Sequence, residues 1–205
     1  MFITFEGIDY SGKSTQAKML CEYLKSKKLK AIAIREPGGT EVSERIRELL
    51  LSKIDLHITP LTEFLLFSAA RAQLVADVIK PDLMKNYIVI CDRFFDSSTA
   101  YQGFGANVDI KKILAVNDFA TGGLTPDLTF LFDIPPKEAF KRYEIRKDSK
   151  DRMENKNLAF YNRVHKGFRE IADKNRNRFV VIKGSKTISD IHNIIVNIVM
   201  KKIKS

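Results

Sequence analysis

Short apolar runs alternate with longer stretches of helical periodicity through the whole chain. The runs are rich in β-branched and aromatic residues, which favour strands. We predict strands at Phe2–Glu6, Ala31–Arg35, Tyr87–Cys91, Leu128–Phe132 and Phe179–Ile182. Strands separated by helices in this way predict an α/β fold, in which helices cover a parallel sheet.

The stretches between these runs carry apolar residues at intervals of three and four, the spacing of an amphipathic helix. One such set begins at Val42 and another at Ile191. We predict helices over residues 14–28, 40–51, 61–84 and 188–203, the third of them ending near Pro81 or one turn beyond it.

Composition sets the outer limits of the fold. With 205 residues, of which 44% are hydrophobic, we expect a single domain over 1–205, with small inserts at most. No stretch approaches the roughly 20 uninterrupted apolar residues of a membrane helix, and the N-terminus lacks a signal-peptide pattern. We therefore expect a cytoplasmic protein without a membrane partner. Cys21 and Cys91 lack metal-ligand spacing and fit reduced, packed thiols.

The chain is strongly basic. Its formal net charge of +10 predicts an anionic partner but does not distinguish nucleic acid from small phosphates. The cations are dispersed or gathered in one charge-dense segment, and they are not interleaved with aromatic residues as in a nucleic-acid surface. We expect no nucleic-acid partner, and a nucleic-acid-binding protein is kept as an alternative.

A glycine-bearing loop follows the first predicted strand. Residues 7–15 read GIDYSGKST, which fits the phosphate-loop pattern GxxxxGK[ST] between a strand and a helix. Backbone amides of such a loop and the helix N-terminus cradle phosphate oxygens, while the lysine neutralises charge and the hydroxyl binds magnesium. The alternative is a chance match in a glycine-bearing turn, which the flanking strand and helix disfavour. We predict a nucleoside triphosphate site at Gly7, Ile8, Asp9, Tyr10, Ser11, Gly12, Lys13, Ser14 and Thr15.

Residues just after the strands of a parallel sheet are candidates for ligand binding. Asp92 ends the third strand, where phosphate-loop enzymes place a carboxylate that helps to hold Mg²⁺, directly or through water. Arg93 suits a bidentate phosphate contact. An ion pair between these two neighbours is the alternative, and it is disfavoured because adjacent strand residues point to opposite faces.

The long predicted helix carries a possible base site. Phe67 and Arg71 lie four residues apart on one face, so that a ring could stack on a base while a guanidinium bonds its edge. The alternative is that Phe67 belongs to the core and Arg71 is a surface cation.

Five segments together resemble the bacterial thymidylate kinases. They read TFEGIDYSGKST, REPGGTEVSERIR, LLFSAAR, CDRFFDSSTAYQG and GGLTPDLTFLFDI, in that order. The resemblance implies transfer of a phosphoryl group from ATP to dTMP with Mg²⁺. It also implies the nucleoside monophosphate kinase fold, with a five-stranded parallel sheet, helices on both faces and a mobile lid, and it implies a homodimer.

The same resemblance assigns roles to individual residues. Phe67 would stack on thymine, Arg71 would bond its exocyclic oxygen, and Tyr101 would crowd the sugar 2′ position. Cations near the acceptor phosphate would hold the nucleophilic oxygen in line. The dTMP site would comprise Asp9, Glu36, Pro37, Arg47, Phe67, Arg71, Arg93, Ser98, Tyr101 and Gln102.

A charge-dense segment near residues 141–156 is the candidate lid. It has few apolar residues, so it is either a solvated helix end or a lid whose arginines close on the phosphoryl group. Some thymidylate kinases carry a catalytic arginine where this chain has Tyr10, so the charge has to come from elsewhere. Arg146 is our first choice, followed by Arg142 and Arg152. The predicted catalytic residues are therefore Asp9, Lys13, Arg93 and Arg146. By this resemblance Arg142 and Arg146 also belong to the ATP site, together with residues 7–15.

Two further interpretations remain. A regulatory GTPase would share the phosphate loop but needs a base-reading Asn/Lys-x-Asp signature, which we do not find. A sister kinase acting on another monophosphate or on a nucleoside is closer, because fold does not fix substrate. Residues 183–186 follow the last strand, where the family contacts adenine.

Overall fold

The computed structural model describes residues 1–51, 56–146 and 156–204. Five parallel strands form one sheet with the order β2-β3-β1-β4-β5. The five predicted strands are confirmed, with ends shifted by one residue in three of them. Their bounds are β1 Phe2–Glu6, β2 Ala31–Arg35, β3 Ile88–Asp92, β4 Leu128–Asp133 and β5 Phe179–Lys183.

The central strand β1 sets the position of the phosphate loop. All five of its residues are buried, because strands β3 and β4 flank it and helices cover both faces. The register pairs Phe5 with Asp92 on one side and with Phe130 on the other. The loop after β1 therefore opens beside the end of β3, as expected for a parallel sheet.

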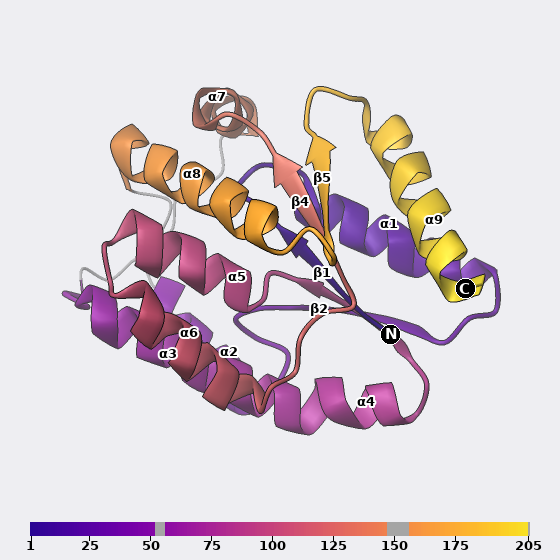
Figure 1. Cartoon of the computed structure of the whole chain (residues 1–205), viewed down its shortest axis with the longest axis horizontal. Coiled ribbons are helices and arrows are strands. Elements are labelled where there is room, and N and C mark those ends of the chain that lie inside the picture. The colour runs from indigo at the N-terminus through magenta and orange to yellow at the C-terminus, as the bar shows by residue number, and fades with distance from the viewer. Residues whose placement is uncertain (52–55, 147–155, 205) are drawn as a thin grey trace.

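One face of the sheet is covered by α1 (Lys13–Ser26) and α9 (Ile188–Lys204), which lie together in Figure 1. Leu20 and Leu24 of α1 and Ile195 of α9 pack against sheet residues such as Phe130. These helices confirm the amphipathic patterns found over 14–28 and 188–203. Together with apolar side chains of the strands, they form the hydrophobic core on this side of the sheet.

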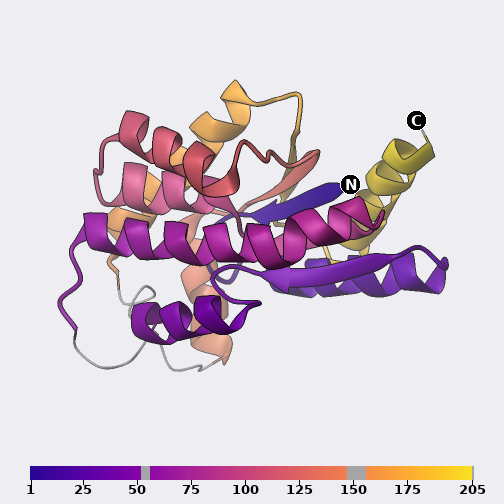
Figure 2. The same cartoon turned by 90° about the horizontal axis from the view of Figure 1, so that it is seen from below.

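The other face carries a long helical segment. The predicted helix over 61–84 is observed as α3 (Pro60–Leu74), the wider π-helical turn η1 (Val75–Ile79) and α4 (Lys80–Met84), which run on as one rod in Figure 2. Thr59 caps its start by accepting a hydrogen bond from the Thr62 amide. The helix α2 (Glu41–Leu51) packs beside α3.

The same face is completed by helices that follow β3 and β4. α8 packs on η2, so the segment after β3 is held against a helix far away in the sequence. No helix in the described part of the chain is long and apolar enough to cross a membrane. The helices are α5 Phe95–Ser98, η2 Thr99–Gly105 (a π-helix), α6 Ile110–Thr121, α7 Pro136–Arg146 and α8 Leu158–Lys174.

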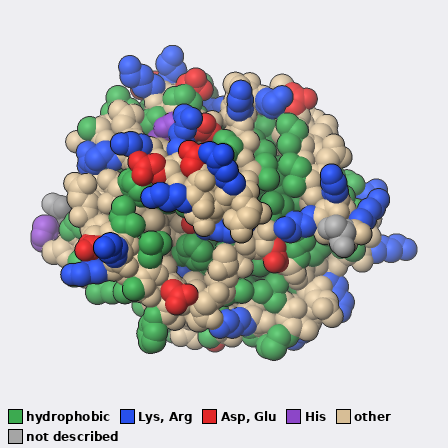
Figure 3. Space-filling view, viewed as in Figure 1, with side chains coloured by type: hydrophobic (Ala, Val, Ile, Leu, Met, Phe, Trp, Pro, Cys, Tyr) green, Lys and Arg blue, Asp and Glu red, His purple; other side chains and the backbone are tan. Residues whose placement is uncertain are grey.

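Lys and Arg side chains are spread over the face seen in Figure 3, among acidic, polar and apolar ones. A hollow lined with hydrophobic side chains lies near the middle of this face.

Candidate active site

A cavity of about 780 Å³ opens at the carboxyl ends of the strands. It joins the phosphate loop, the turn after β2, the exposed side of α3 and the segment after β3. The predicted site residues that line it are Asp9, Tyr10, Ser11, Gly12, Lys13, Ser14, Thr15, Glu36, Pro37, Arg47, Phe67, Arg71, Asp92, Arg93, Ser98, Tyr101, Gln102 and Arg142.

Two glycines give the phosphate loop its path. Gly7 has φ 138° and Gly12 has φ 99°, values that L side chains rarely adopt. A Cβ at Gly7 would also lie 2.8 Å from the carbonyl oxygen of Phe132. Gly12 caps the N-terminus of α1, where unpaired backbone amides favour an anion.

Lys13 is folded back on the loop. Its Nζ donates to the carbonyl oxygen of Ile8 at 2.7 Å and to Oγ of Ser11 at 3.3 Å. Burial first and the nearby charge of Arg93 second lower the pKa of Lys13 to about 8. Of the described loop residues, Gly7 and Ile8 stand behind the cavity lining and contribute carbonyl acceptors to its cations.

Ser14 and Asp92 meet at the rim of the sheet. Ser14 Oγ donates a hydrogen bond to Oδ2 of Asp92, while the other oxygen, Oδ1, is buried without a partner in the described residues. A hydroxyl beside a carboxylate oxygen with free lone pairs is a donor set that a hydrated Mg²⁺ prefers. These two residues therefore fit the magnesium site that the sequence predicts.

Arg93 lies at the centre of the cavity wall. It adopts φ 70° just after β3 and pairs with Asp9, while Nη1 donates to the Gly7 carbonyl at 2.9 Å and to Ser97 Oγ at 3.1 Å. Its guanidinium contacts these groups and the Tyr101 hydroxyl, in agreement with the expectation that Arg93 points away from Asp92. A guanidinium anchored in this way is held ready for an anionic ligand.

Glu6 supports the turn that contains Arg93. Its two carboxylate oxygens accept from the Phe94 amide at 2.8 Å and from Ser97 Oγ at 2.6 Å. Burial first and the nearby charge of Asp96 second raise the pKa of Glu6 to about 8. The sequence analysis did not identify this residue.

Asp9 is surrounded by donors. Tyr101 Oη donates to its Oδ2 at 2.8 Å and Tyr161 Oη to the same oxygen at 3.0 Å, while Arg93 pairs with Oδ1. Burial acts to raise the pKa of Asp9, but the charges of Arg93 and Lys13 and the two hydroxyls outweigh it and hold the pKa below its usual value. Asp9 is therefore an ionised carboxylate at neutral pH.

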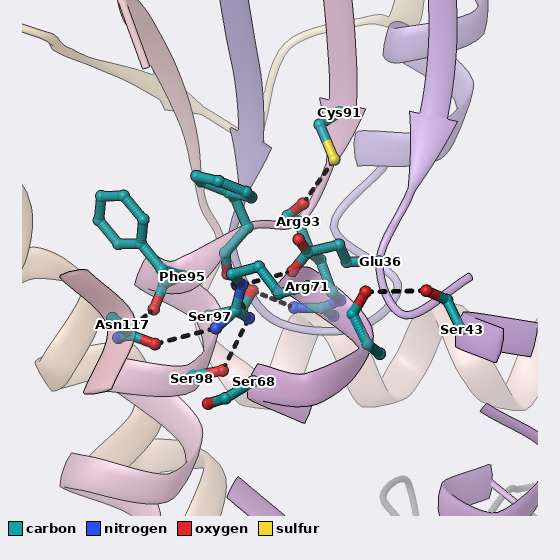
Figure 4. Close-up of polar contacts among 12 residues, drawn as sticks. Glu36, Ser43, Ser68, Arg71, Cys91, Arg93, Phe95, Ser97, Ser98 and Asn117 are labelled. Carbon is teal, nitrogen blue, oxygen red and sulfur yellow. Dashed lines mark hydrogen bonds and ion pairs between the residues drawn. The ribbon is translucent and has the colours of Figure 1, made fainter. Parts of the chain in front are cut away.

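Arg71 is the hub of a buried polar network, drawn in Figure 4. Its Nε donates to Glu36 at 2.8 Å, Nη1 to Asn117 at 2.9 Å and Nη2 to Ser98 at 2.9 Å. The residue is 2% exposed, so the alternative of a surface cation is wrong. Phe67, one turn away on the same helix, is only half-buried and lines the cavity, in contrast to a core residue.

Glu36 and Arg47 lie at the turn after β2. Burial raises the pKa of Glu36 to about 7, although the Arg71 guanidinium acts in the opposite direction. Its Oε1 is buried without a hydrogen-bond partner in the described residues. Arg47 reaches back from α2, where Nη1 donates to the Pro37 carbonyl at 2.8 Å.

The predicted lid is described in part. Residues 141–146 continue α7, where Arg142 Nη2 donates to the Gly184 carbonyl at 2.7 Å and Tyr143 packs on Tyr10 with ring centroids 5.2 Å apart. Tyr10 thus contacts α7 from the phosphate loop. Arg146 ends α7, but its side chain lies outside the described residues, as does Arg152.

The sequence analysis missed several lining residues. Ile188 and Ile191 of α9 follow β5, so the rule that located Asp92 would have drawn attention to them. Gly184 and Lys186, within the expected adenine segment, do line the cavity. Further unpredicted lining residues are Gln16, Arg35, Leu51, Phe94, Ser97 and Phe132.

The family model that matches this chain is that of thymidylate kinase, over residues 5–195. The chain belongs to the thymidylate kinase family. It is 46% identical over 197 residues to the thymidylate kinase of Kosmotoga olearia, which covers 96% of this chain and 93% of that protein. It is also 46% identical to that of Thermosipho africanus over 205 residues, with both chains fully covered.

A solved structure agrees with this assignment. The crystal structure of thymidylate kinase from Ehrlichia chaffeensis matches with a TM-score of 0.78 and 38% identity, covering 98% of each chain. Thymidylate kinase family membership over nearly the whole length makes the chain a phosphotransferase that converts dTMP to dTDP with ATP. The expected fold is confirmed, and the sister-kinase alternative is disfavoured.

Proposed function

We propose that the cavity holds ATP and dTMP together, with their phosphates meeting between Lys13 and Arg93. One observation carries this proposal: the phosphate loop, Phe67 and Arg93 line the same cavity, and Arg93 pairs with Asp9 of that loop. Two anionic nucleotides held in line need this arrangement of cations, since phosphoryl transfer depends mainly on positioning and electrostatic stabilisation.

On the ATP side, amides of residues 8–15 and the N-terminus of α1 bind the β- and γ-phosphates. Lys13 Nζ leaves its loop acceptors and contacts terminal phosphate oxygens. Ser14 would hold Mg²⁺ through its hydroxyl and Asp92 through water. The metal ion held there would supply positive charge against the negative charge that develops on the transferred phosphoryl group.

On the dTMP side, Phe67 stacks on the base and Arg71 donates to its exocyclic oxygen. Within the described residues, four hydrogen bonds use four of the five guanidinium N–H groups of Arg71, so one donor at Nη1 is left for the base. Ser98 and Gln102 complete the polar edge. Arg47 and Arg93 bind the acceptor phosphate near Glu36, and Asp9 and Tyr101 lie against the sugar.

The arginine that meets the transferred phosphoryl group comes from the lid in this proposal. Arg142 contributes to the ATP side, and its position supports that role because it lines the cavity beside Gly184. Arg146 is the first candidate for the catalytic charge, followed by Arg142 and Arg152.

A homodimer also belongs to this proposal. Exposed apolar side chains lie on α3 and α6, which pack together, and such a surface suits a second copy of the chain. They are Leu61, Leu65, Leu114 and Phe119. Light scattering should give twice the chain mass, and Phe119→Lys should lower it. The cytoplasmic location stays a prediction.

A coupled assay of ADP release tests the acceptor site across dTMP, dUMP, dCMP and thymidine. We expect dTMP to have the highest kcat/KM with ATP and Mg²⁺. Equal or better use of another acceptor would contradict the thymine site. A crystal with both ligands tests the arrangement, and dTMP bound away from the triphosphate tail would refute it.

A further inference from the structure

Helix α3 carries three side chains at intervals of four residues on the side that faces the segment after β3. Glu63, Phe67 and Arg71 therefore share one face of the helix. Two polar links run from this face to the segment that follows β3, one from Arg71 to Ser98 and one from Glu63 to Gln102. Phe67 lies between them, so the links flank the ring that would stack on the base.

The Glu63–Gln102 contact fixes the orientation of the Gln102 side-chain amide. Gln102 Nε2 donates to Glu63 Oε1 at 2.8 Å, and both residues are buried, with exposed fractions of 2% and 4%. A carboxylate only accepts hydrogen bonds, so it selects the nitrogen end of the amide. Glu63 is not among the described residues that line the cavity, whereas Gln102 is. Glu63 thus acts from behind Gln102.

With its nitrogen held by Glu63, Gln102 has its carbonyl oxygen left for the ligand. Oε1 of Gln102 accepts no hydrogen bond within the described part of the chain. An acceptor in this pocket suits the N3–H of thymine or uracil. Cytosine has a lone pair on N3 and an amino group in place of O4, so it would set acceptor against acceptor there and donor against the Arg71 donor.

We propose that Glu63 is a positioning residue that sets the donor–acceptor polarity of the base pocket, and so favours thymine and uracil over cytosine. This inference rests on the proposed base site. The Gln102 oxygen receives N3–H directly or through one water, while Glu63 does not touch the nucleotide. Discrimination between thymine and uracil is outside its reach, because the two bases share this edge.

The test is Glu63→Gln, because a glutamine at this position can donate as well as accept and would let the Gln102 amide turn over. We expect the ratio of kcat/KM for dCMP to that for dTMP to rise by about tenfold. The ratio for dUMP to dTMP should stay unchanged. Glu22→Gln, the same chemical change at an exposed site on α1, is the matched control and should alter neither ratio.

Two more variants separate polarity from folding. Glu63→Met removes the acceptor at similar volume and should also raise the ratio of kcat/KM for dCMP to that for dTMP. If this variant is less stable, it can be assayed at low temperature, where the same rise is expected. Glu63→Asp keeps an acceptor and should retain more of the discrimination. In a Gln102→Leu background, Glu63→Gln should no longer shift the ratio.

If kcat/KM fell by the same factor for dTMP, dUMP and dCMP in Glu63→Gln and in Glu63→Met, the inference would be overturned, because a purely structural role predicts that result. If Gln102→Leu nevertheless lowers dTMP use, the base site stands and only the role of Glu63 fails. Unchanged dTMP use in Gln102→Leu would instead remove Gln102 from the base site and refute that part of the proposed function.

Discussion

Tyr161 donates from Oη to Oδ2 of Asp9 at 3.0 Å and so joins α8 to the phosphate loop across 152 residues. Tyr101 donates to the same oxygen, which leaves that carboxylate oxygen with two hydroxyl donors. This pairing keeps Asp9 ionised and fixed within the cavity, where it also anchors Arg93. An acidic residue in a phosphate loop would otherwise repel the ligand, and here its charge is directed toward protein donors.

Tyr161→Phe removes one of these donors without changing the ring packing. We expect the free energy of unfolding to fall by about 1 kcal/mol, and kcat/KM for dTMP to fall several-fold as Asp9 loosens. Urea unfolding and steady-state kinetics measure the two effects. Tyr87→Phe is the control at a half-buried ring and should leave kcat/KM unchanged. Unaltered kinetics in Tyr161→Phe would contradict the positioning of Asp9.

Phe67→Ala tests the stacking role. Loss of a ring that stacks on a base costs about 1–3 kcal/mol, so dTMP affinity should fall roughly ten- to hundredfold. ATP affinity should stay close to that of the parent, because the ring lies on the acceptor side of the cavity. Calorimetric titration with each nucleotide separates the two, and unchanged dTMP affinity would eliminate the stacking contact.

The low pKa of Lys13 predicts a pH dependence of ATP binding. In the free protein, burial first and the charge of Arg93 second lower this pKa to about 8, from an ordinary value of 10.5. Phosphate favours the charged amine and raises the pKa in the complex, so binding above pH 8 takes up a proton. Affinity should therefore fall as the pH rises from 8 toward 10.

Calorimetry in buffers of different ionisation enthalpy measures that proton uptake directly. Lys13→Arg is the matched variant, since a guanidinium stays charged across this range and should abolish the uptake. Proton uptake that persists in Lys13→Arg would assign the titration to another group.

Arg146→Ala tests the source of the catalytic charge. Turnover should fall by about 10³-fold, while the affinities for ATP and dTMP change little, because the interaction forms only in the transition state. Arg142→Ala is the comparison and should mainly weaken ATP binding, since Arg142 lines the cavity beside Gly184 and is proposed to contact ATP. Full turnover in Arg146→Ala would move the catalytic role to Arg152 or Arg142.

A buried ion pair away from the cavity sets a stability prediction. Arg178 Nη1 and Nη2 donate to the two oxygens of Asp96 at 2.7 and 2.9 Å, and both side chains are buried. Asp96→Asn leaves the guanidinium without its counter-charge and should lower the free energy of unfolding by about 3–5 kcal/mol. Asp173→Asn breaks an exposed ion pair with Arg176 and should change the free energy of unfolding by less than about 1 kcal/mol. Similar losses in both variants, measured by urea unfolding, would contradict this.

Local spacing was enough to predict the strands, the phosphate loop and the rim of the sheet. Gly7 and Gly12 stand at fixed positions between an apolar run and a helix, and parallel strands place their carboxyl ends at one edge. That rule alone was enough to predict that Asp92 and Arg93 lie near Lys13. The buried state of Arg71 could not be predicted, because its partner Asn117 lies 46 residues away.

What the sequence determined by itself is thus the set of residues whose roles follow from a short motif: the anion-binding loop, the strand-end carboxylate and the family to which they belong. Only the tertiary structure decided which distant side chains support them, such as Tyr161 behind Asp9 and Glu63 behind Gln102. The physical reason is that motif chemistry depends on neighbours along the chain. Supporting contacts depend on how helices rotate and pack against the sheet, and no local pattern records that geometry.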